Sequence, residues 1–364
     1  MTEIKTDRQH YPALDGVRGI AILLVVFFHN FGFINYFFFG WLGVDLFFVL
    51  SGFLITDILI RETGSKNYLK SFYTRRILRI FPIYYLLLII FLLILPHFIS
   101  STVNLEYYTN NQAWLWTYTQ NWLYIIKPHA YSNILLHLWS LAVEEQYYLI
   151  WPFVILIFRK PKVLLAISLF FLIGIIILRL VLWNKQIEGF QYFSWFTFSR
   201  IDGICIGSAL ALIKFISPKF ITNNTPYIIS SVAIFNFVFY FINKNYGFSF
   251  PYFPLIGYTT FAIVFAVIVS EAATLNKNFI TILLSFTPLR FIGKISYGFY
   301  IYHWPIYVLL FPILLNYLKQ VLHINTGSSQ FLAAAIATVA GFLISILSFY
   351  FFEMPFLKLK KYFR

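Results

Sequence analysis

Long apolar runs recur along the whole chain, and each ends at charged or aromatic residues. Most are about 20 residues long, which is the length a helix needs to cross ~30 Å of hydrocarbon at ~1.5 Å per residue. They predict an all-α, polytopic transmembrane helix bundle with about ten spans. The predicted spans are residues 19–37, 41–60, 80–98, 138–158, 163–183, 195–215, 227–242, 252–269, 295–316 and 331–352. The run 279–286 is too short to cross and is predicted to lie along the membrane surface.

The basic residues between these runs orient the bundle. The loop 61–79 holds the densest set, including Lys66, Lys70, Arg75 and Arg76, and the positive-inside rule places it in the cytoplasm. The loop 100–137 contains Lys127 as its only Lys or Arg, so it is predicted to face outward and to cover an outer binding cavity. Alternation of the spans then places both termini in the cytoplasm.

Composition supports a membrane protein rather than a soluble one. Hydrophobic residues make up 60% of the 364 positions and charged residues 11%, against about a quarter in soluble domains. The net charge of +14 is interpreted as a signal of membrane topology and as a means of contact with anionic lipid, not as a sign of nucleic-acid binding. One cysteine, Cys205, excludes an internal disulfide. Without repeats or a composition break, residues 1–364 are expected to form a single membrane domain whose first span is not cleaved.

Arg18 and His29 bracket the first apolar run and are the first candidates for chemistry. Eleven helical positions separate them by roughly 16 Å, which places a guanidinium near the inner surface and an imidazole near the bilayer centre. An ionisable ring in hydrocarbon is costly, so an intramembrane His is a functional candidate. The alternative, a His that hydrogen-bonds a neighbouring helix, stays open from this segment alone.

Glu144 is predicted to lie at a similar depth. If its span enters from outside near residue 138, the carboxylate differs from His29 in depth by about 6 Å. A carboxylate at that depth is able to orient the imidazole and raise its basicity, as general-base catalysis requires. The alternative is a helix-end carboxylate near water. Glu145 points roughly 100° away on a helix and is expected to be the solvated one of the two.

Arg75, Arg76 and Arg79 stand together before the third predicted span. Arg76 and Arg79 are three residues apart and therefore share a helix surface, and guanidinium groups bind phosphate oxygens through paired hydrogen bonds. Basic residues that flank a span are also ordinary topology signals, so both interpretations stay open.

Further polar residues fall inside or beside apolar runs, where they usually face a bundle interior or a wet cavity. Those considered for substrate contact are Asp45, Ser51, Ser140, Arg200, Asp202, Tyr297, Tyr300 and His303. For Asp45, Ser51 and Ser140 a helix-end or interhelical hydrogen bond is favoured. Arg200 and Asp202 are expected either to pair with each other or to touch an acceptor, and Arg179 is interpreted as a snorkelling side chain. His303 is either a second polar wall of the cavity or a packing residue beside tyrosines.

Several other chemistries lack their sequence signals. The seven histidines are scattered, and none stands at metal-ligand spacing from a Cys or a carboxylate. No glycine-rich phosphate loop precedes a soluble helix, and no nucleophile elbow of a serine hydrolase occurs.

Five ordered motifs resemble those of the integral-membrane acyltransferase 3 family. They are YPALDGVRG at 11–19 with His29, GVDLFFVLSGFLI at 43–55, RILRIFP at 76–82, LWSLAVEEQYYL at 138–149 and SYGFYIYHWP at 296–305, and a closing EMP follows at 353–355. Together they cover nearly the whole chain. The order of several motifs is a specific signal, whereas any one of them would be weak.

The resemblance implies transfer of an acyl group, most commonly acetyl, from cytoplasmic acyl-CoA to a hydroxyl of a cell-envelope glycan or related acceptor. Residue by residue, it implies that His29 and Glu144 are catalytic and that Arg18, Arg76 and Arg79, with Arg75 beside them, hold the CoA phosphates. The expected partners are therefore acyl-CoA as co-substrate, a glycan or lipid-linked acceptor and the bilayer, in a bacterial inner or plasma membrane, with no permanently bound cofactor. Many relatives carry a fused extracytoplasmic esterase-like domain; none is expected here, so the chain would act alone, as a homo-oligomer or with a separate extracytoplasmic transferase.

One alternative from another class remains at this point. A transporter or flippase of a glycan or small metabolite would use His29 and Glu144 as a proton relay. Inverted repeats and broken helices, which are frequent in transporters, are not evident in the sequence.

Overall fold

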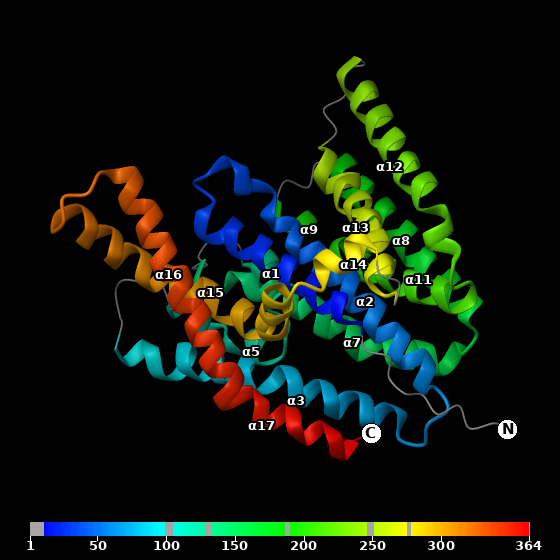
Figure 1. Cartoon of the computed structure of the whole chain (residues 1–364), viewed down its shortest axis with the longest axis horizontal. Helices are drawn as coiled ribbons and strands as arrows, with labels where there is room; N and C mark the ends of the chain where they lie inside the picture. Colours follow the sequence, from blue (N-terminus) through cyan, green and yellow to red (C-terminus); the bar gives the residue numbers. More distant parts are fainter. Residues whose placement is uncertain are drawn as a thin grey trace. The chain divides into compact units, whose positions relative to one another are not determined.

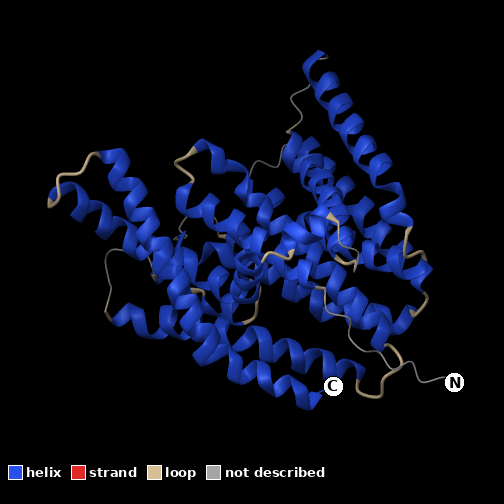
Figure 2. Ribbon diagram, in the orientation of Figure 1, coloured by secondary structure: helices blue, strands red, loops and turns tan. Residues whose placement is uncertain are grey.

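The computed structural model describes residues 11–98, 105–127, 133–185, 190–245, 251–274 and 278–363. These residues form helices and no strands (Figure 2), so the predicted all-α fold is confirmed. The helices are α1 (Pro12–Phe31), α2 (Leu42–Glu62), α3 (Tyr68–Leu88), α4 (Glu106–Asn110), α5 (Gln112–Trp116), α6 (Gln120–Ile126), α7 (Trp139–Phe158), α8 (Pro161–Asn184), α9 (Phe190–Ser194), α10 (Thr197–Arg200), α11 (Asp202–Ile216), α12 (Phe220–Asn245), α13 (Tyr258–Ala272), α14 (Phe279–Leu284), α15 (Thr287–Gln320), α16 (Thr326–Ser348) and α17 (Met354–Leu359).

Within the described residues, 9 helices are long and apolar enough to cross a membrane. They match nine of the ten predicted spans. The remaining prediction, 195–215, corresponds mainly to α11, whose 15 residues extend only about 22 Å. The apolar run was predicted as one helix because the chain stays hydrophobic there, but the short helix α10 ends at Arg200 before α11 begins at Asp202.

The structure differs from the prediction at the start of the third helix and in the loop that follows it. The third predicted span begins at residue 80, whereas α3 begins at Tyr68, so Arg75, Arg76 and Arg79 are part of the helix rather than of a loop before it. In its described residues, the loop 100–137 contains the short helices α4, α5 and α6. Tyr84 and Tyr85 of α3 donate hydrogen bonds to the carbonyls of Leu115 and Trp116 at 2.8 and 3.1 Å, which fixes α5 against this helix. Where these short helices lie relative to a membrane stays a prediction.

The chain divides into two compact units. The first unit contains residues 45–68 and 146–291 together with the start of α1. The second contains residues 19–44, 69–145 and 292–364. In the second unit, α3 and α17 run side by side (Figure 1), and the hydroxyl of Ser71 on α3 donates to the Phe363 carbonyl just beyond α17 at 2.7 Å.

Glycines set a close helix crossing in the first unit, between α2 and α11. A Cβ atom at Gly52 would lie 2.0 Å from the Ile204 carbonyl oxygen, and one at Gly207 would lie 2.0 Å from the Val49 carbonyl oxygen. Small residues allow membrane helices to pack backbone against backbone, because lipid supplies little hydrophobic force to hold helices together. The two glycines therefore hold α2 at the distance that its buried side chains require.

We predict that Gly207→Ala destabilises the protein, because the added methyl group forces α2 and α11 apart at a cost of about 1–3 kcal/mol. Gly174→Ala is the matched control, since a Cβ atom there meets nothing within 4 Å and alanine favours the helix. Thermal unfolding of the detergent-purified variants measures both. A Gly207→Ala midpoint equal to that of the wild type would show that the crossing tolerates separation.

Candidate functional site

Helix α15 carries the polar face around which the second unit is built. Tyr297, Tyr300 and His303 recur every three residues and therefore lie along one side of the helix. The Tyr297 hydroxyl donates to the Ile80 carbonyl on α3 at 3.0 Å, and the Tyr300 hydroxyl donates to the His137 carbonyl at 2.8 Å. Two of these three sequence candidates, Tyr297 and Tyr300, are thus fixed to neighbouring segments by their own hydrogen bonds.

His303 is the partner of His29. The Nδ1 atom of His29 lies 2.8 Å from the Nε2 atom of His303, and the two rings are nearly parallel, with centroids 5.1 Å apart. His303 is fully buried and His29 is half-buried. Asn30 lies next to His29 and donates to the Thr338 hydroxyl on α16 at 2.8 Å, which holds this end of α1 in place.

The surroundings of His303 decide where the protons of this pair lie. Its Nδ1 atom is 2.8 Å from the Tyr300 carbonyl oxygen and 3.2 Å from the Phe299 carbonyl oxygen. Carbonyl oxygens only accept hydrogen bonds, so Nδ1 of His303 carries the proton and its Nε2 is an acceptor. The bond between the rings must then be donated by Nδ1 of His29. In the neutral pair, Nε2 of His29 keeps a lone pair, the form that a base or a nucleophile needs.

This geometry corrects the orienting role expected of Glu144. Among the described residues, the hydrogen-bond partner of the His29 ring is His303, not the carboxylate. The prediction from depth alone could not distinguish two polar groups at similar heights on different helices. A catalytic role of Glu144 stays a prediction, and this half-buried carboxylate acts electrostatically on Tyr297, Tyr300 and Glu145.

Contacts between α7 and α15 follow an antiparallel order. The imidazole of His137, just before α7, lies 3.3 Å from the Ile301 carbonyl oxygen, and Ser140 Oγ lies 2.6 Å from the Tyr300 hydroxyl. Farther along, Glu144 is within electrostatic range of Tyr297. Ser140 therefore forms the interhelical bond that the sequence favoured. His137 was missed because it immediately precedes the recognised motif at 138–149 and no spacing rule singled it out.

Arg76 and Arg79 of α3 interact electrostatically with carboxylates. Arg76 and Glu144 are the charged groups that act on Glu145, and Arg79 is the charged group that acts on Glu353 of the closing segment. Glu145 is half-buried, as Glu144 is, so the structure does not single it out as the solvated one of the two. Glu353 is 7% exposed and was not a candidate, although the sequence placed it in the closing motif.

Arg75 differs from its two neighbours. Its Nη1 atom donates to Ser71 Oγ and, at 3.1 Å, to the carbonyl oxygen of Phe363. These contacts tie α3 to the residues after α17 and give Arg75 a structural role. Its predicted contact with a phosphate is not tested by the structure.

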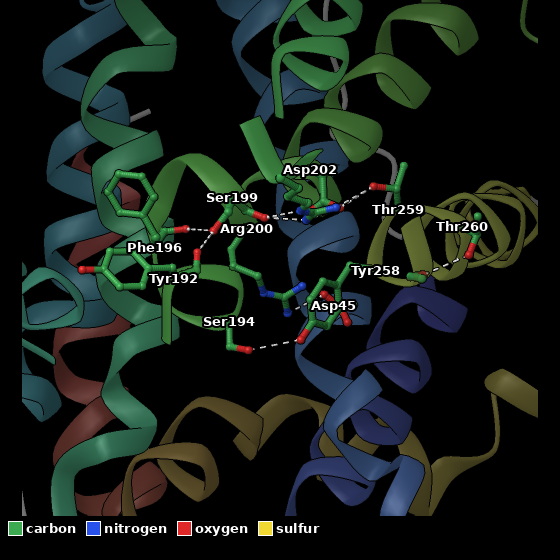
Figure 3. A network of polar contacts seen from close by, with 12 residues as sticks. Asp45, Tyr192, Ser194, Phe196, Ser199, Arg200, Asp202, Tyr258, Thr259 and Thr260 are labelled. Carbon is green, nitrogen blue, oxygen red and sulfur yellow. Dashed lines mark hydrogen bonds and ion pairs between the residues drawn. The ribbon is translucent and has the colours of Figure 1, made fainter. Parts of the chain in front are cut away.

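The first unit contains a separate, fully buried network of charges (Figure 3). Arg179 of α8 pairs with Asp202 at 2.8 Å, and Arg200 pairs with Asp45 of α2 at 2.8 Å. All four side chains are at most 2% exposed. Arg179 also donates to the Ser199 carbonyl and to the Thr259 hydroxyl, the latter at 3.0 Å.

Two sequence interpretations are corrected here. Arg179 does not snorkel: its guanidinium is enclosed, because Asp202 and Thr259 supply partners inside the protein. Arg200 and Asp202 do not form an ion pair with each other; each pairs with a residue of another helix, and the Arg200 guanidinium lies 3.8 Å over the Tyr258 ring. Asp45 forms an interhelical contact, as favoured, whereas contact of these residues with an acceptor stays a prediction.

Two candidates remain. Arg18 pairs at 2.9 Å with Asp15, one turn earlier on α1, and Ser51 is half-buried on α2. Both residues belong to the first unit. That they contact CoA or an acceptor is not tested.

Comparison with known proteins now adds the family. A family model described as an acyltransferase domain matches residues 11–350. The chain belongs to the acyltransferase 3 family. The resemblance of its motifs is thereby confirmed over nearly the whole chain.

Curated relatives of this acyltransferase 3 chain carry related names. It is 30% identical over 375 residues to peptidoglycan O-acetyltransferase OatA of Listeria monocytogenes, with 96% of this chain and 56% of the relative covered. It is 33% identical over 325 residues to O-acetyltransferase OatA of Staphylococcus aureus, with 82% and 51% covered. The chain thus spans about half the length of these relatives. No solved structure matches it.

We predict that Arg179→Met strongly destabilises the first unit, because it leaves Asp202 charged and buried without its cation, at a cost of about 3–5 kcal/mol. Arg179→Met combined with Asp202→Asn should recover part of the loss, since the unpaired charge is gone. Arg61→Met is the control: its pair with Asp57 is exposed and contributes at most about 1 kcal/mol. Yield and melting temperature after size-exclusion chromatography report the effect, and a wild-type-like Arg179→Met protein would contradict it.

Proposed function

We propose that this multi-pass membrane acyltransferase moves an acetyl group from cytoplasmic acetyl-CoA to a hydroxyl of a cell-envelope glycan. Family membership supports O-acyl transfer rather than transport. The observation that carries the proposal is the His29–His303 pair, because it gives a half-buried imidazole a defined free nitrogen. The acetyl group and the glycan are proposed from the names of the relatives.

In the direct route, His29 acts as a general base. Its Nε2 atom accepts the proton of the acceptor hydroxyl while the hydroxyl oxygen attacks the thioester carbonyl. The new C–O bond forms, the C–S bond breaks, and the proton on His29 passes to the leaving CoA thiolate. The imidazolium that forms in between donates from Nδ1 to His303, which stabilises the positive charge where it develops.

An acyl-enzyme route uses the same pair. Here Nε2 of His29 attacks the thioester, CoA leaves, and the Nδ1 proton of the acylated ring passes to Nε2 of His303. His303 takes this proton at Nε2, while its own Nδ1–H continues to donate to two carbonyl oxygens. The acceptor oxygen then takes the acetyl group while its proton passes to His29. His303 gives up its extra proton, which balances the one that the CoA thiolate takes up, and both rings become neutral again.

The arginines of α3 are proposed to hold the CoA phosphates. Arg76 and Arg79 are half-buried on one helix surface, and Glu145 and Glu353 are carboxylates that interact electrostatically with them. Two guanidinium groups on one surface can donate paired hydrogen bonds to phosphate oxygens. Along α15, Tyr297 lies near Arg79, and His303 lies six residues or about 9 Å farther on, so an extended pantetheine arm would run from one to the other.

We predict that His29→Ala lowers acetyl transfer by at least about 100-fold, because a positioned base contributes about 10²–10⁴-fold. The protein should still fold, with a melting temperature lowered only by the loss of the donor to Nε2 of His303, which costs about 1–3 kcal/mol. Transfer of labelled acetyl from acetyl-CoA to base-treated cell-wall glycan is the assay. His97→Ala, which removes an exposed imidazole, should keep wild-type activity.

Variants of His303 separate positioning from packing. The carbonyl of a Gln side chain can occupy the place of Nε2 and accept from His29, whereas Ala cannot. His303→Gln should therefore keep more turnover than His303→Ala, with KM little changed in both.

Transfer by His29→Ala at the wild-type rate would refute the chemistry assigned to His29.

We predict that Arg76→Gln and Arg79→Gln raise the KM for acetyl-CoA about tenfold or more each with little change in kcat, because charge-assisted bonds to phosphate contribute mainly to binding. Arg75→Gln should have a smaller effect, since its guanidinium already donates to Ser71 and Phe363. Steady-state kinetics against acetyl-CoA decides between them. Equal, small effects of all three variants would mean that these arginines act as topology signals.

A further inference from the structure

His137, just before α7, is a buried histidine that the sequence analysis did not single out and that the proposed reaction does not involve. Its ring is 3% exposed, and its centroid lies 5.5 Å from that of His303 in a nearly perpendicular arrangement. Its backbone carbonyl accepts the Tyr300 hydroxyl, and its Nε2 atom lies 3.3 Å from the Ile301 carbonyl oxygen. The residue is therefore held from two directions by α15.

These contacts define the tautomer of the ring. The Ile301 carbonyl only accepts, so Nε2 of His137 carries the proton and the lone pair of the neutral ring lies on Nδ1. This Nδ1 atom is buried and has no hydrogen-bond partner among the described residues. A buried acceptor that stays unpaired costs about 1–3 kcal/mol, and such groups are usually satisfied by protein, water or ligand.

The location of His137 indicates which substrate it meets. On α7 and the turn before it, His137 precedes Glu145, which interacts electrostatically with Arg76, by eight residues or roughly 12 Å. On the antiparallel α15, the His303 ring lies about 9 Å beyond Tyr297. Both histidines are thus displaced in the same sense from the arginines proposed to bind CoA phosphates. His137 therefore lies at the level of His303, away from the residues proposed to hold the CoA phosphates, and this favours the acyl acceptor as the molecule that it meets.

We propose that Nδ1 of His137 binds a hydroxyl or amide N–H of the acyl acceptor, at a position next to the hydroxyl that is acylated. This assignment rests on the proposed function. One hydroxyl of the acceptor approaches His29, and a second donor on the same molecule pairs with His137. An unprotonated nitrogen accepts O–H and N–H groups but offers nothing to carboxylates or phosphates. The acceptor class is consequently a sugar with several donors rather than a simple alcohol.

Two substitutions separate this role from a structural one. In His137→Gln, the side-chain N–H₂ can replace Nε2 and donate to the Ile301 carbonyl, but the acceptor at Nδ1 is lost. In His137→Asn, the side-chain oxygen can replace Nδ1, but the bond to Ile301 is lost. The proposal requires His137→Asn to retain more activity than His137→Gln; a role in packing alone requires the opposite.

The test is carried out in bacteria that lack their own peptidoglycan O-acetyltransferase and express the full chain at matched membrane levels. Acetate released from purified cell wall by mild base reports transfer. We expect His137→Asn to retain at least half of the wild-type acetate and His137→Gln to lose about tenfold. CoA titration of both purified variants should agree with the wild type within about twofold.

Each other outcome counts against the assignment. Wild-type acetate with His137→Gln, or equal losses in both variants with a lowered melting temperature, would show that His137 is structural. Weakened CoA binding by His137→Gln would move the contact to the donor. If the wild-type chain itself adds no acetate, the proposed function fails, and the role of His137 fails with it; this result differs from all the others because it appears before any substitution is made.

Discussion

Two backbone carbonyls of α15 set the chemistry of the second unit. The carbonyl oxygens of Phe299 and Tyr300 hold the Nδ1 proton of His303, which leaves Nε2 as the only acceptor of that ring. Nδ1 of His29 must then donate, and its Nε2 is left with a lone pair. Helices normally use such carbonyls for backbone bonds, so a buried imidazole that also donates to them is restrained in both position and tautomer. The tautomer of His29 is therefore determined by His303, which lies on another helix.

The same principle, that each charge or proton must have a partner inside the bundle, shapes the first unit. Two arginines and two aspartates are enclosed there with no net charge, and each ion pair joins different helices or helix ends. Such pairs add little stability over apolar packing, but removal of one partner is costly. They therefore select one arrangement of α2, α8 and α11, with Gly52 and Gly207 allowing the backbones to approach.

Much of this could be predicted from the sequence. Apolar length gave nine of the spans because hydrocarbon thickness constrains them directly, and ordered motifs gave the family. Depth along single helices also placed His29 and His303 inside spans. The depth of a residue along its helix does not show how the helix is rotated or which side chain on another helix it meets. His29 meets His303 rather than Glu144, and Arg179 meets Asp202 rather than the membrane surface, because side-chain partners depend on how helices cross. His137 and Glu353 were missed because no spacing rule marks a polar residue at a helix end as buried.

The central claim is that His303 fixes His29 with its proton on Nδ1 and its lone pair on Nε2. Nitrogen NMR of the protein labelled with ¹⁵N-histidine, assigned through His29→Gln and His303→Gln, tests it directly. The account predicts that both rings are neutral near pH 7, each with a protonated Nδ1 and a bare Nε2, and that His303→Gln changes the His29 signals. A His29 ring protonated at Nε2, or one indifferent to the loss of His303, would contradict it.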